Sequence, residues 1–274
     1  MQISQLSTIT IYPVKSLAGI NVTNWQVTET GLAYDRKWML IDSHGDFLSQ
    51  RKLPTMALIK TRMTESELIL SAPGQEDLTL PLATTNDTRI PYTVWEHEGT
   101  GLAVSALADE WFSSFLQQTC RLVCQPDDCI RSVDPVYGQI NDRVSFSDGF
   151  PFLIISENSL TSLNQAMNLN LPMSRFRPNL VITGCPAYAE DYWREITIGN
   201  IDFRLPKPCS RCSVPTIDQE TGKIGKEPLT TLNRLRKWQN KVYFGQNAIH
   251  NQLGILTVGD TVTINLSGLP QPPL

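Results

Sequence analysis

Two cysteines, Cys209 and Cys212, stand two residues apart in a stretch rich in prolines, hydroxyl groups and cations. Proline fixes φ and removes a backbone donor, so residues 206–216 are predicted to form a stiff loop rather than the middle of a helix or sheet. Lys207 and Arg211 flank the thiols, and nearby cations favour the thiolate, which is a nucleophile and a soft metal ligand. The stretch is therefore a candidate site for sulfur chemistry; the alternative is a turn that holds two ordinary buried cysteines.

Cations also stand at the ends of predicted strands in the first half of the chain. Lys15 and Ser16 follow a strand predicted at residues 3–14, and Arg36 precedes the apolar run at residues 37–41. Taken singly, such side chains are usually solvated. Taken together, they fit an anion clamp in which lysine acts as a point charge and arginine as a bidentate fork.

The second half of the chain carries a similar signal. Residues 175–179, Arg-Phe-Arg-Pro-Asn, place two arginines and a proline just before the apolar strand at residues 180–182, which favours a site over a surface loop. Residues 148–155 are typical of a turn that leads into a buried strand. Ser156 is predicted to cap the helix that follows, and the strand, the polar turn and the helix N-terminus form a candidate anion-binding corner.

The pattern of apolar residues predicts a fold that is mostly β with a few helices, a β-rich α+β class. Residues 1–95 contain short strands at close spacing, which is typical of a barrel or sandwich. Apolar side chains at three- and four-residue steps predict an amphipathic helix at residues 102–118, whose aromatic residues belong to the core. Residues 193–205 are predicted to form a hairpin and residues 229–238 a helix.

Composition excludes several classes of protein. A chain of 274 residues with 41% hydrophobic content suffices for one large or two ordinary domains. Its net charge of -4 disfavours nonspecific nucleic-acid binding, and no apolar run approaches the ~18 residues of a membrane span. Residues 1–6 show no basic leader followed by an apolar segment, so we expect no signal peptide.

The six cysteines form no dense disulfide framework, which suits a reducing compartment, so we expect the protein to be cytoplasmic. The spacing of Cys120, Cys124 and Cys129 matches neither a zinc ribbon nor an iron–sulfur motif. Only three histidines are present, and they are scattered. A histidine-rich metal site is therefore not expected.

Six short motifs occur in a fixed order along the chain: Tyr12-Pro13-Val14-Lys15-Ser16, Asp35-Arg36, Arg175-Phe176-Arg177-Pro178-Asn179, Cys209-Ser210-Arg211-Cys212, Glu227-Pro228-Leu229 and Phe244-Gly245-Gln246-Asn247. In this order they resemble the MOSC family, in the branch with an N-terminal MOSC β-domain. That branch includes the mitochondrial amidoxime-reducing component and bacterial reductases of N-hydroxylated bases. The similarity runs over nearly the whole chain.

The resemblance implies a MOSC β-barrel plus an N-terminal β domain. Residues 1–118 would form the N-terminal β domain, although the first 36 residues could join the C-terminal barrel. Residues 119–266 would form the MOSC domain, and residues 267–274 a Pro-rich tail.

The resemblance also implies a molybdenum cofactor (Mo-molybdopterin), a pterin that carries a dithiolene for the metal and an anionic phosphate. By analogy Cys212 would be the metal ligand and the catalytic residue, with Cys209 as its neighbour. No side chain stands out as a general acid, and Asp148 and Asp35 are the nearest candidates. The residues that match cofactor-binding positions of the family are Lys15, Ser16, Arg36, Gly149, Phe150, Arg177, Asn179, Ser210, Arg211 and Asn247.

The activity that the resemblance implies is a two-electron reduction of a small-molecule substrate, N–OH to N–H, with no nucleic-acid or membrane partner. Some relatives carry a C-terminal ferredoxin-type domain, whereas the last cysteine here is Cys212. Electrons are therefore expected from a separate donor protein, a flavoprotein reductase or a ferredoxin type; the alternative is that the Pro-rich tail is the stub of a linker from which a ferredoxin-type domain is missing.

Two rival functions remain open at this point. One is a cofactor-binding or sulfur-carrier module without its own turnover, which a persulfide on Cys212 or Cys209 would mark. The other is a dithiol oxidoreductase that uses the same two thiols. The prolines around them disfavour it, because a redox Cys-x-x-Cys motif belongs at the start of a helix.

Overall fold

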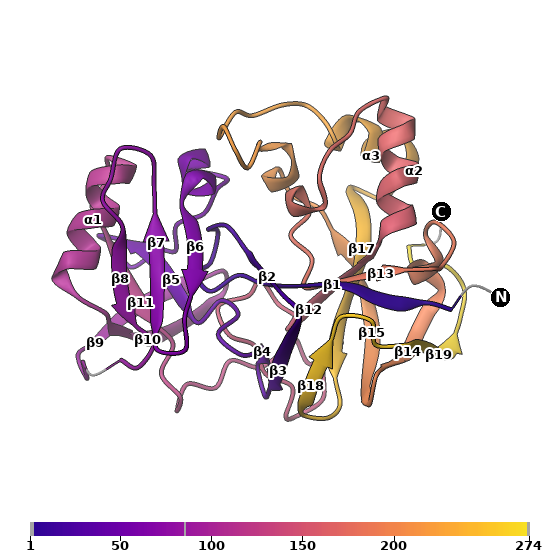
Figure 1. Ribbon diagram of the computed structural model, residues 1–274, viewed down its shortest axis with the longest axis horizontal. Helices are drawn as coiled ribbons and strands as arrows, with labels where there is room; N and C mark the ends of the chain where they lie inside the picture. Colours follow the sequence, from indigo (N-terminus) through magenta and orange to yellow (C-terminus); the bar gives the residue numbers. More distant parts are fainter. Residues whose placement is uncertain (1–2, 85, 273–274) are drawn as a thin grey trace.

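The computed structural model describes residues 3–84 and 86–272. Short strands dominate this part of the chain, and three α-helices pack on them, so the predicted class, mostly β with a few helices, is confirmed. Two predicted features lie partly outside the described residues. These are residues 1–2 of the N-terminus, where no leader is expected, and residues 273–274 of the predicted tail. Figure 1 shows two lobes, the strands β5–β11 on one side and β12–β19 on the other.

A nine-stranded sheet forms the larger lobe, in the order β19-β14-β15-β17-β12-β13-β1-β2, with β16 paired to β17. Its strands are β1 (Gln5–Ile11), β2 (Ile20–Val22), β12 (Phe152–Ser156), β13 (Leu180–Thr183), β14 (Trp193–Ile198), β15 (Ile201–Ser210), β16 (Lys237–Trp238), β17 (Lys241–His250) and β19 (Val262–Ser267). The N-terminal β1 lies antiparallel to β13, with Ile9 opposite Leu180. The first strands of the chain therefore belong to the lobe that the second half builds.

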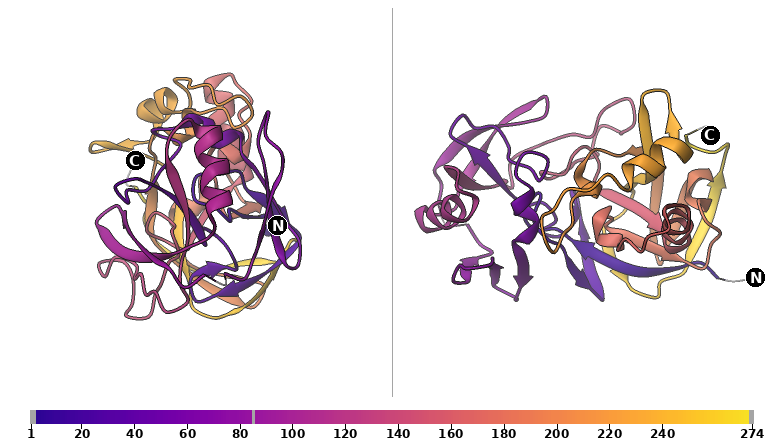
Figure 2. Two further views of the ribbon diagram at one scale, coloured as in Figure 1. Left: turned by 90° about the vertical axis from the view of Figure 1, so that its left-hand side faces the viewer. Right: turned by 90° about the horizontal axis from the view of Figure 1, so that it is seen from above.

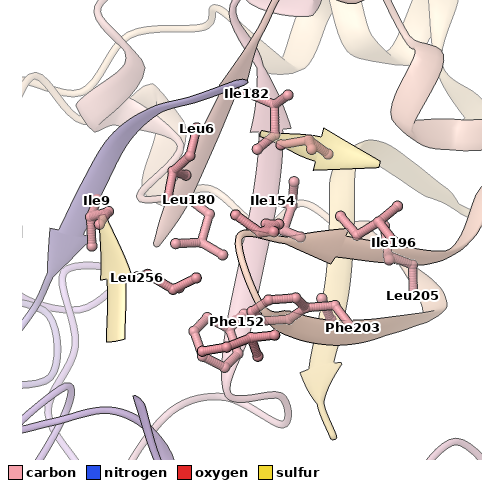
Figure 3. Packing of buried hydrophobic residues seen from close by; sticks show 14 of the residues in the cluster. Leu6, Ile9, Phe152, Ile154, Leu180, Ile182, Ile196, Phe203, Leu205 and Leu256 are labelled. Atoms are coloured by element: carbon pink, nitrogen blue, oxygen red, sulfur yellow. The ribbon is translucent and has the colours of Figure 1, made fainter. Parts of the chain in front are cut away.

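A three-stranded sheet covers the inner face of this large sheet. It contains β3 (Asn24–Thr28), β4 (Gly31–Leu32) and β18 (Gly254–Thr257). Leu256 of β18 packs with Ile154, Phe152 and Phe203 in one buried cluster, and the two phenylalanine rings meet edge-on at 5.1 Å (Figure 3). Full burial of such side chains contributes about 1.5–3 kcal/mol each.

The expected barrel is not closed by a continuous ladder anywhere in the described part of the chain. Backbone bonds around one isolated antiparallel bridge, Gln5 to Thr261, instead tie the start of β1 to the start of β19. Leu6 N–H donates to Asp260 O at 2.9 Å, and Val262 N–H donates to Ser4 O at 2.8 Å. The lobe is thus an open, curled sheet with a small sheet across it.

The described residues of the smaller lobe form a four-stranded and a three-stranded antiparallel sheet, one α-helix and a short 3-10 helix at Pro54–Leu58, arranged as Figures 1 and 2 show. Its elements are β5 (Trp38–Asp42), β6 (Lys60–Met63), β7 (Glu67–Ser71), β8 (Leu78–Pro81), β9 (Arg89–Val94), β10 (His97–Ala103), α1 (Ala106–Leu116) and β11 (Cys120–Cys124). The predicted amphipathic helix is confirmed, since α1 buries Phe112 completely. Because β11 pairs with β5, the sheet of this lobe extends past residue 119.

Two helices lie on the outer face of the large sheet, α2 (Glu157–Met167) and α3 (Leu229–Leu235). Side chains alternate between the faces of a strand, so Ile154 faces the inner core while Ile155 packs with Leu163 of α2 and Leu232 of α3. The predicted helix at 229–238 is shorter than expected, because its last residues turn into β16. The predicted hairpin at 193–205 is confirmed by β14 and β15.

Candidate functional site

One cavity gathers all the candidate site residues. Segments from both lobes line it: the ends of strands in the first half, and loops and strand ends in the second half. Its lining includes Cys212 and every residue proposed by resemblance to bind a cofactor, namely Lys15, Ser16, Arg36, Gly149, Phe150, Arg177, Asn179, Ser210, Arg211 and Asn247.

Three of these residues have an unusual backbone conformation. Ser16, Arg36 and Arg177 adopt left-handed conformations, with φ of 70°, 50° and 58°. A non-glycine residue in such a region costs on the order of 1–3 kcal/mol, and this strain clusters at functional sites. All three lie in loops between strands and line the cavity.

Lys15 is buried and makes two short bonds. Its Nζ donates to Phe146 O at 2.7 Å and to Asp148 Oδ1 at 2.5 Å. The Asp148 side chain is 66% exposed to solvent at the cavity, yet the protein around it still opposes its ionisation. The Lys15 ammonium and its hydrogen bond outweigh this desolvation and hold the pKa of Asp148 well below its usual range. Asp148 is therefore a carboxylate at neutral pH.

We expect Asp148→Asn to lower the free energy of unfolding by about 1 kcal/mol at pH 7, because it removes the partner charge of a buried lysine. Since the folded-state pKa is depressed, this contribution is complete above the unfolded-state value of about 3.9 and is lost as the pH falls below it. Denaturant titrations at pH 7 and pH 3 measure the difference. Asp127→Asn is the control, since Asp127 also pairs with a lysine but is 99% exposed; equal pH dependence in both variants would contradict the assignment.

Arg36 is oriented by two neighbours. Its Nη1 donates to Asp35 Oδ2 at 2.5 Å and to Asn179 Oδ1 at 3.1 Å. The Asn179 oxygen also accepts from Leu153 N–H, and its Nδ2 donates to Thr10 O. Asn179 therefore positions Arg36 and joins three strand ends beside the cavity that it lines.

Arg177 has no carboxylate within ion-pair distance among the described residues. Its Nη1 donates to Leu17 O at 2.7 Å, and its guanidinium lies 4.2 Å from the ring centre of Tyr12. Arg36 stacks on the same ring at 4.4 Å. Burial lowers the pKa of Arg177 to about 10, so the side chain stays charged at neutral pH.

The two thiols of the cysteine motif have different surroundings. Cys209 is half-buried, and its sulfur accepts from Arg211 Nη1 at 3.1 Å; burial raises its pKa against the attraction of Arg211. Cys212 is exposed. Arg211 Nη2 also donates to Phe176 O at 2.6 Å, whereas its Nε is buried without a hydrogen-bond partner. The geometry thus distinguishes the two cysteines, which the spacing alone could not do.

The prediction of an isolated stiff loop around the cysteines is wrong in one respect. Residues 206–210 are part of β15 and pair with β17. The ladder shifts register between Arg204 and Lys207 and again between Pro208 and Ser210. These irregularities accommodate prolines that lack an N–H donor. The strand then ends at Ser210, within the cysteine motif.

The remaining candidates contribute shape more than charge. Asn247 of β17 lies opposite Lys207 and Leu153, and its Nδ2 donates to Pro208 O at 3.4 Å. A Cβ on Gly149 would meet nothing within 4 Å, so this residue leaves open space in the cavity wall. Phe150 packs edge-on against Tyr137 at 6.0 Å.

The sequence reasoning missed a segment of the first lobe, Ser49-Gln50-Arg51, that also lines the cavity. Gln50 is fully buried, and its Nε2 donates to Ser16 O at 2.7 Å, which fixes the Ser16 turn. The signal was present, because a hydroxyl and a cation follow a short apolar pair, as at the other strand ends. Ser147, whose buried hydroxyl has no partner, was also missed.

The predicted anion-binding corner at Ser156 is already filled. Ser156 caps α2 as expected, accepting from Ser159 N–H at 3.1 Å. However, Glu190 Oε1 accepts from Ser156 N–H and its Oε2 accepts from Ser159 Oγ. An internal carboxylate therefore satisfies this helix end, and sequence alone could not reveal a partner so distant along the chain.

Family models match both halves of this chain. The MOSC N-terminal beta barrel domain matches residues 3–119, and the MOSC domain matches residues 141–263. Mitochondrial amidoxime-reducing component 1 of Mus musculus is 35% identical over 95% of this chain and 82% of that protein. The chain belongs to the MOSC family. The resemblance predicted from the sequence motifs is thus confirmed.

Other relatives of this MOSC protein fall into two groups. Mitochondrial amidoxime-reducing component 1 of Homo sapiens is 35% identical over 95% of this chain and 83% of that protein. Molybdenum cofactor sulfurase of Arabidopsis thaliana is 33% identical over 88% of this chain but only 32% of that protein. The first relationship indicates an oxidoreductase. Within the described residues of this MOSC protein, no helix has the length and apolarity needed to cross a membrane.

Proposed function

We propose that this protein binds a molybdenum cofactor in the cavity and reduces N-hydroxylated compounds, N–OH to N–H. The observation that carries the proposal is the composition of the cavity wall. Among the described residues that line it, five are cations, Lys15, Arg36, Arg51, Arg177 and Arg211, and one is a carboxylate, Asp148. Such a wall favours an anionic ligand, and the exposed thiol of Cys212 adds a soft metal ligand beside it.

The cations fall into distinct roles. Lys15 and Arg36 each have a carboxylate partner, so they shape the cavity with little net charge. Arg177 and Arg211 lack one in the structure's described part, and the buried Nε of Arg211 is an unused donor. We assign these two guanidinium groups to the phosphate of the cofactor, through charge-assisted hydrogen bonds.

Cys212 would ligate the metal, and the bound cofactor would supply the two-electron chemistry. Reduction of an N–OH group to N–H consumes two electrons and two protons and releases water. The pKa of Asp148 is held low by Lys15, so Asp148 is no ready proton donor at neutral pH. Burial raises the pKa of Asp35, but its two oxygens accept from Arg36 and from Tyr12 N–H and face the protein rather than the cavity. We therefore assign proton delivery to solvent that enters the cavity.

The substrate would be a small molecule, and a separate donor protein would deliver the electrons. The test is turnover of the cofactor-loaded protein with a chemically reduced viologen and an aryl amidoxime, with the amidine product measured by mass spectrometry. We expect product from the wild type and at least a 100-fold lower rate from Cys212→Ser. Wild type that carries stoichiometric molybdenum, yet reduces no amidoxime, N-hydroxyguanidine or hydroxylamine, would overturn the proposed reaction.

A sulfur-carrier role is the second candidate, because a molybdenum cofactor sulfurase is among the relatives. Cys209 and Cys212 both line the cavity, so either thiol is placed to carry a persulfide. Intact mass spectrometry of freshly purified protein would show a gain of one sulfur that reductant removes. Our primary proposal predicts no such gain.

A further inference from the structure

Arg51 lines the cavity from the smaller lobe and is one of its five cations, but no ligand group is yet assigned to it. Its guanidinium packs beside a pair of neighbouring aromatic rings, 4.3 Å from the ring centre of Trp95 and 5.7 Å from that of Phe47. No carboxylate lies within ion-pair distance of it in residues 3–84 and 86–272. Stacking on aromatic faces holds a guanidinium in place while leaving its N–H groups free to bind.

Trp95 ties this arginine to the rim of the cavity. It occupies the two-residue turn between β9 and β10, where Val94 pairs with His97. Its indole is 44% exposed, and its Nε1 donates to Asp148 Oδ1 at 3.2 Å. Its backbone is left-handed, with φ of 57°, a costly conformation for a bulky residue at a turn that normally takes glycine or asparagine.

The ion pairs of the cavity do not include Arg51, although its charge reaches Asp148 and helps to lower the pKa of that carboxyl. Lys15 is paired with Asp148, Arg36 is paired with Asp35, and the two remaining guanidinium groups come from the other lobe. Arg51 is thus an additional unpaired cation, anchored by an exposed aromatic residue at the cavity rim. A bidentate guanidinium of this kind recognises a carboxylate or a phosphate.

We propose that Arg51, oriented by Trp95, is a specificity residue that binds an oxyanion group on the substrate. The preferred substrates would then be N-hydroxylated compounds that also carry a carboxylate or phosphate. This inference rests on the proposed function. The same chemistry would suit the phosphate of the cofactor, so the experiment separates these two sources of the oxyanion.

The experiment compares an aryl amidoxime with its para-carboxylate derivative on cofactor-loaded protein. The variants are Arg51→Gln, Arg51→Lys, which keeps the charge but loses the planar fork, and Trp95→Phe, which keeps a ring but loses the bond to Asp148. Arg62→Gln is the matched control, because Arg62 is an exposed arginine of the same lobe. Molybdenum and pterin content are measured for every variant before kinetics.

For Arg51→Gln we expect a 10- to 100-fold higher KM for the carboxylated compound, the range that loss of one charge-assisted hydrogen bond produces. The KM of the neutral compound and the cofactor content should stay within twofold of wild type, as in Arg62→Gln. The KM of Arg51→Lys for the carboxylated compound should fall between the values of the wild type and Arg51→Gln. Trp95→Phe should raise only the KM of the carboxylated compound. Equal KM changes for both compounds would overturn the proposal, and so would loss of pterin, which would assign Arg51 to the cofactor phosphate.

Equilibrium binding keeps this test separate from the proposed reaction. Quenching of the exposed Trp95 fluorescence reports binding without turnover, and the Trp95→Phe variant identifies its contribution. If the wild type reduces neither compound but binds the carboxylated one in an Arg51-dependent manner, the oxyanion subsite stands and the reductase proposal fails. If the wild type and Arg51→Gln reduce both compounds with identical KM values, the reductase proposal stands and the oxyanion subsite fails.

Discussion

Cys212→Ser is expected to reduce bound molybdenum at least 10-fold while leaving the protein folded. Cys212 is the exposed thiol of the cavity, and a serine hydroxyl is a poor substitute for a thiolate as a soft metal ligand. An exposed side chain without a hydrogen bond of its own contributes little to folding, so the unfolding transition should stay unchanged. Elemental analysis per mole of folded protein measures the effect.

Cys209→Ser is the matched control for this prediction. The sulfur of Cys209 is occupied by Arg211 at 3.1 Å, and burial raises its pKa, so the thiol is the less suitable ligand of the two. We expect this variant to retain more than half of the wild-type molybdenum. If Cys209→Ser loses the metal and Cys212→Ser keeps it, the two assignments must be exchanged.

Arg177→Ala is expected to weaken cofactor binding by about 10- to 100-fold, which corresponds to the loss of one charge-assisted hydrogen bond. Arg177 reaches the cavity from a left-handed residue, stacks on Tyr12 and has no carboxylate partner in the described chain. Its charge is therefore available to the phosphate. Pterin released from the purified protein and quantified by fluorescence measures the loss.

Arg175→Ala separates cofactor binding from general destabilisation. Arg175 belongs to the same motif and is buried, but it lies 3.6 Å from Asp218 rather than on the cavity wall. We expect this variant to be less stable yet to carry wild-type amounts of pterin when folded. Wild-type pterin in Arg177→Ala, or an equal loss in both variants, would contradict the phosphate assignment.

Local sequence signals were enough to predict which residues would share one cavity. Prolines, hydroxyl residues and cations at strand ends pointed to Lys15, Arg36 and Arg177, and the structure brings them together with the Cys209–Cys212 motif. The reason is that strand ends from different parts of a β-rich fold converge at the same edge. The amphipathic helix α1 and the β14–β15 hairpin were predictable for a similar reason, since their periodicity is local.

Other features depended on partners far apart in the chain and could not be predicted. The amide of Asn179 bonds to Arg36, Leu153 and Thr10, and Glu190 fills the helix end that looked free at Ser156. β15 continues through its prolines because its ladder with β17 tolerates register shifts. Each of these outcomes is a property of tertiary pairing rather than of the residues themselves.

The measurement that tests the central proposal most directly is the molybdenum and pterin content of the wild-type protein, purified gently from a host that makes the cofactor. The account predicts nearly one molybdenum and one pterin per chain. Folded protein that contains neither would contradict it, because a cavity lined by five cations and an exposed thiol would then have some other ligand.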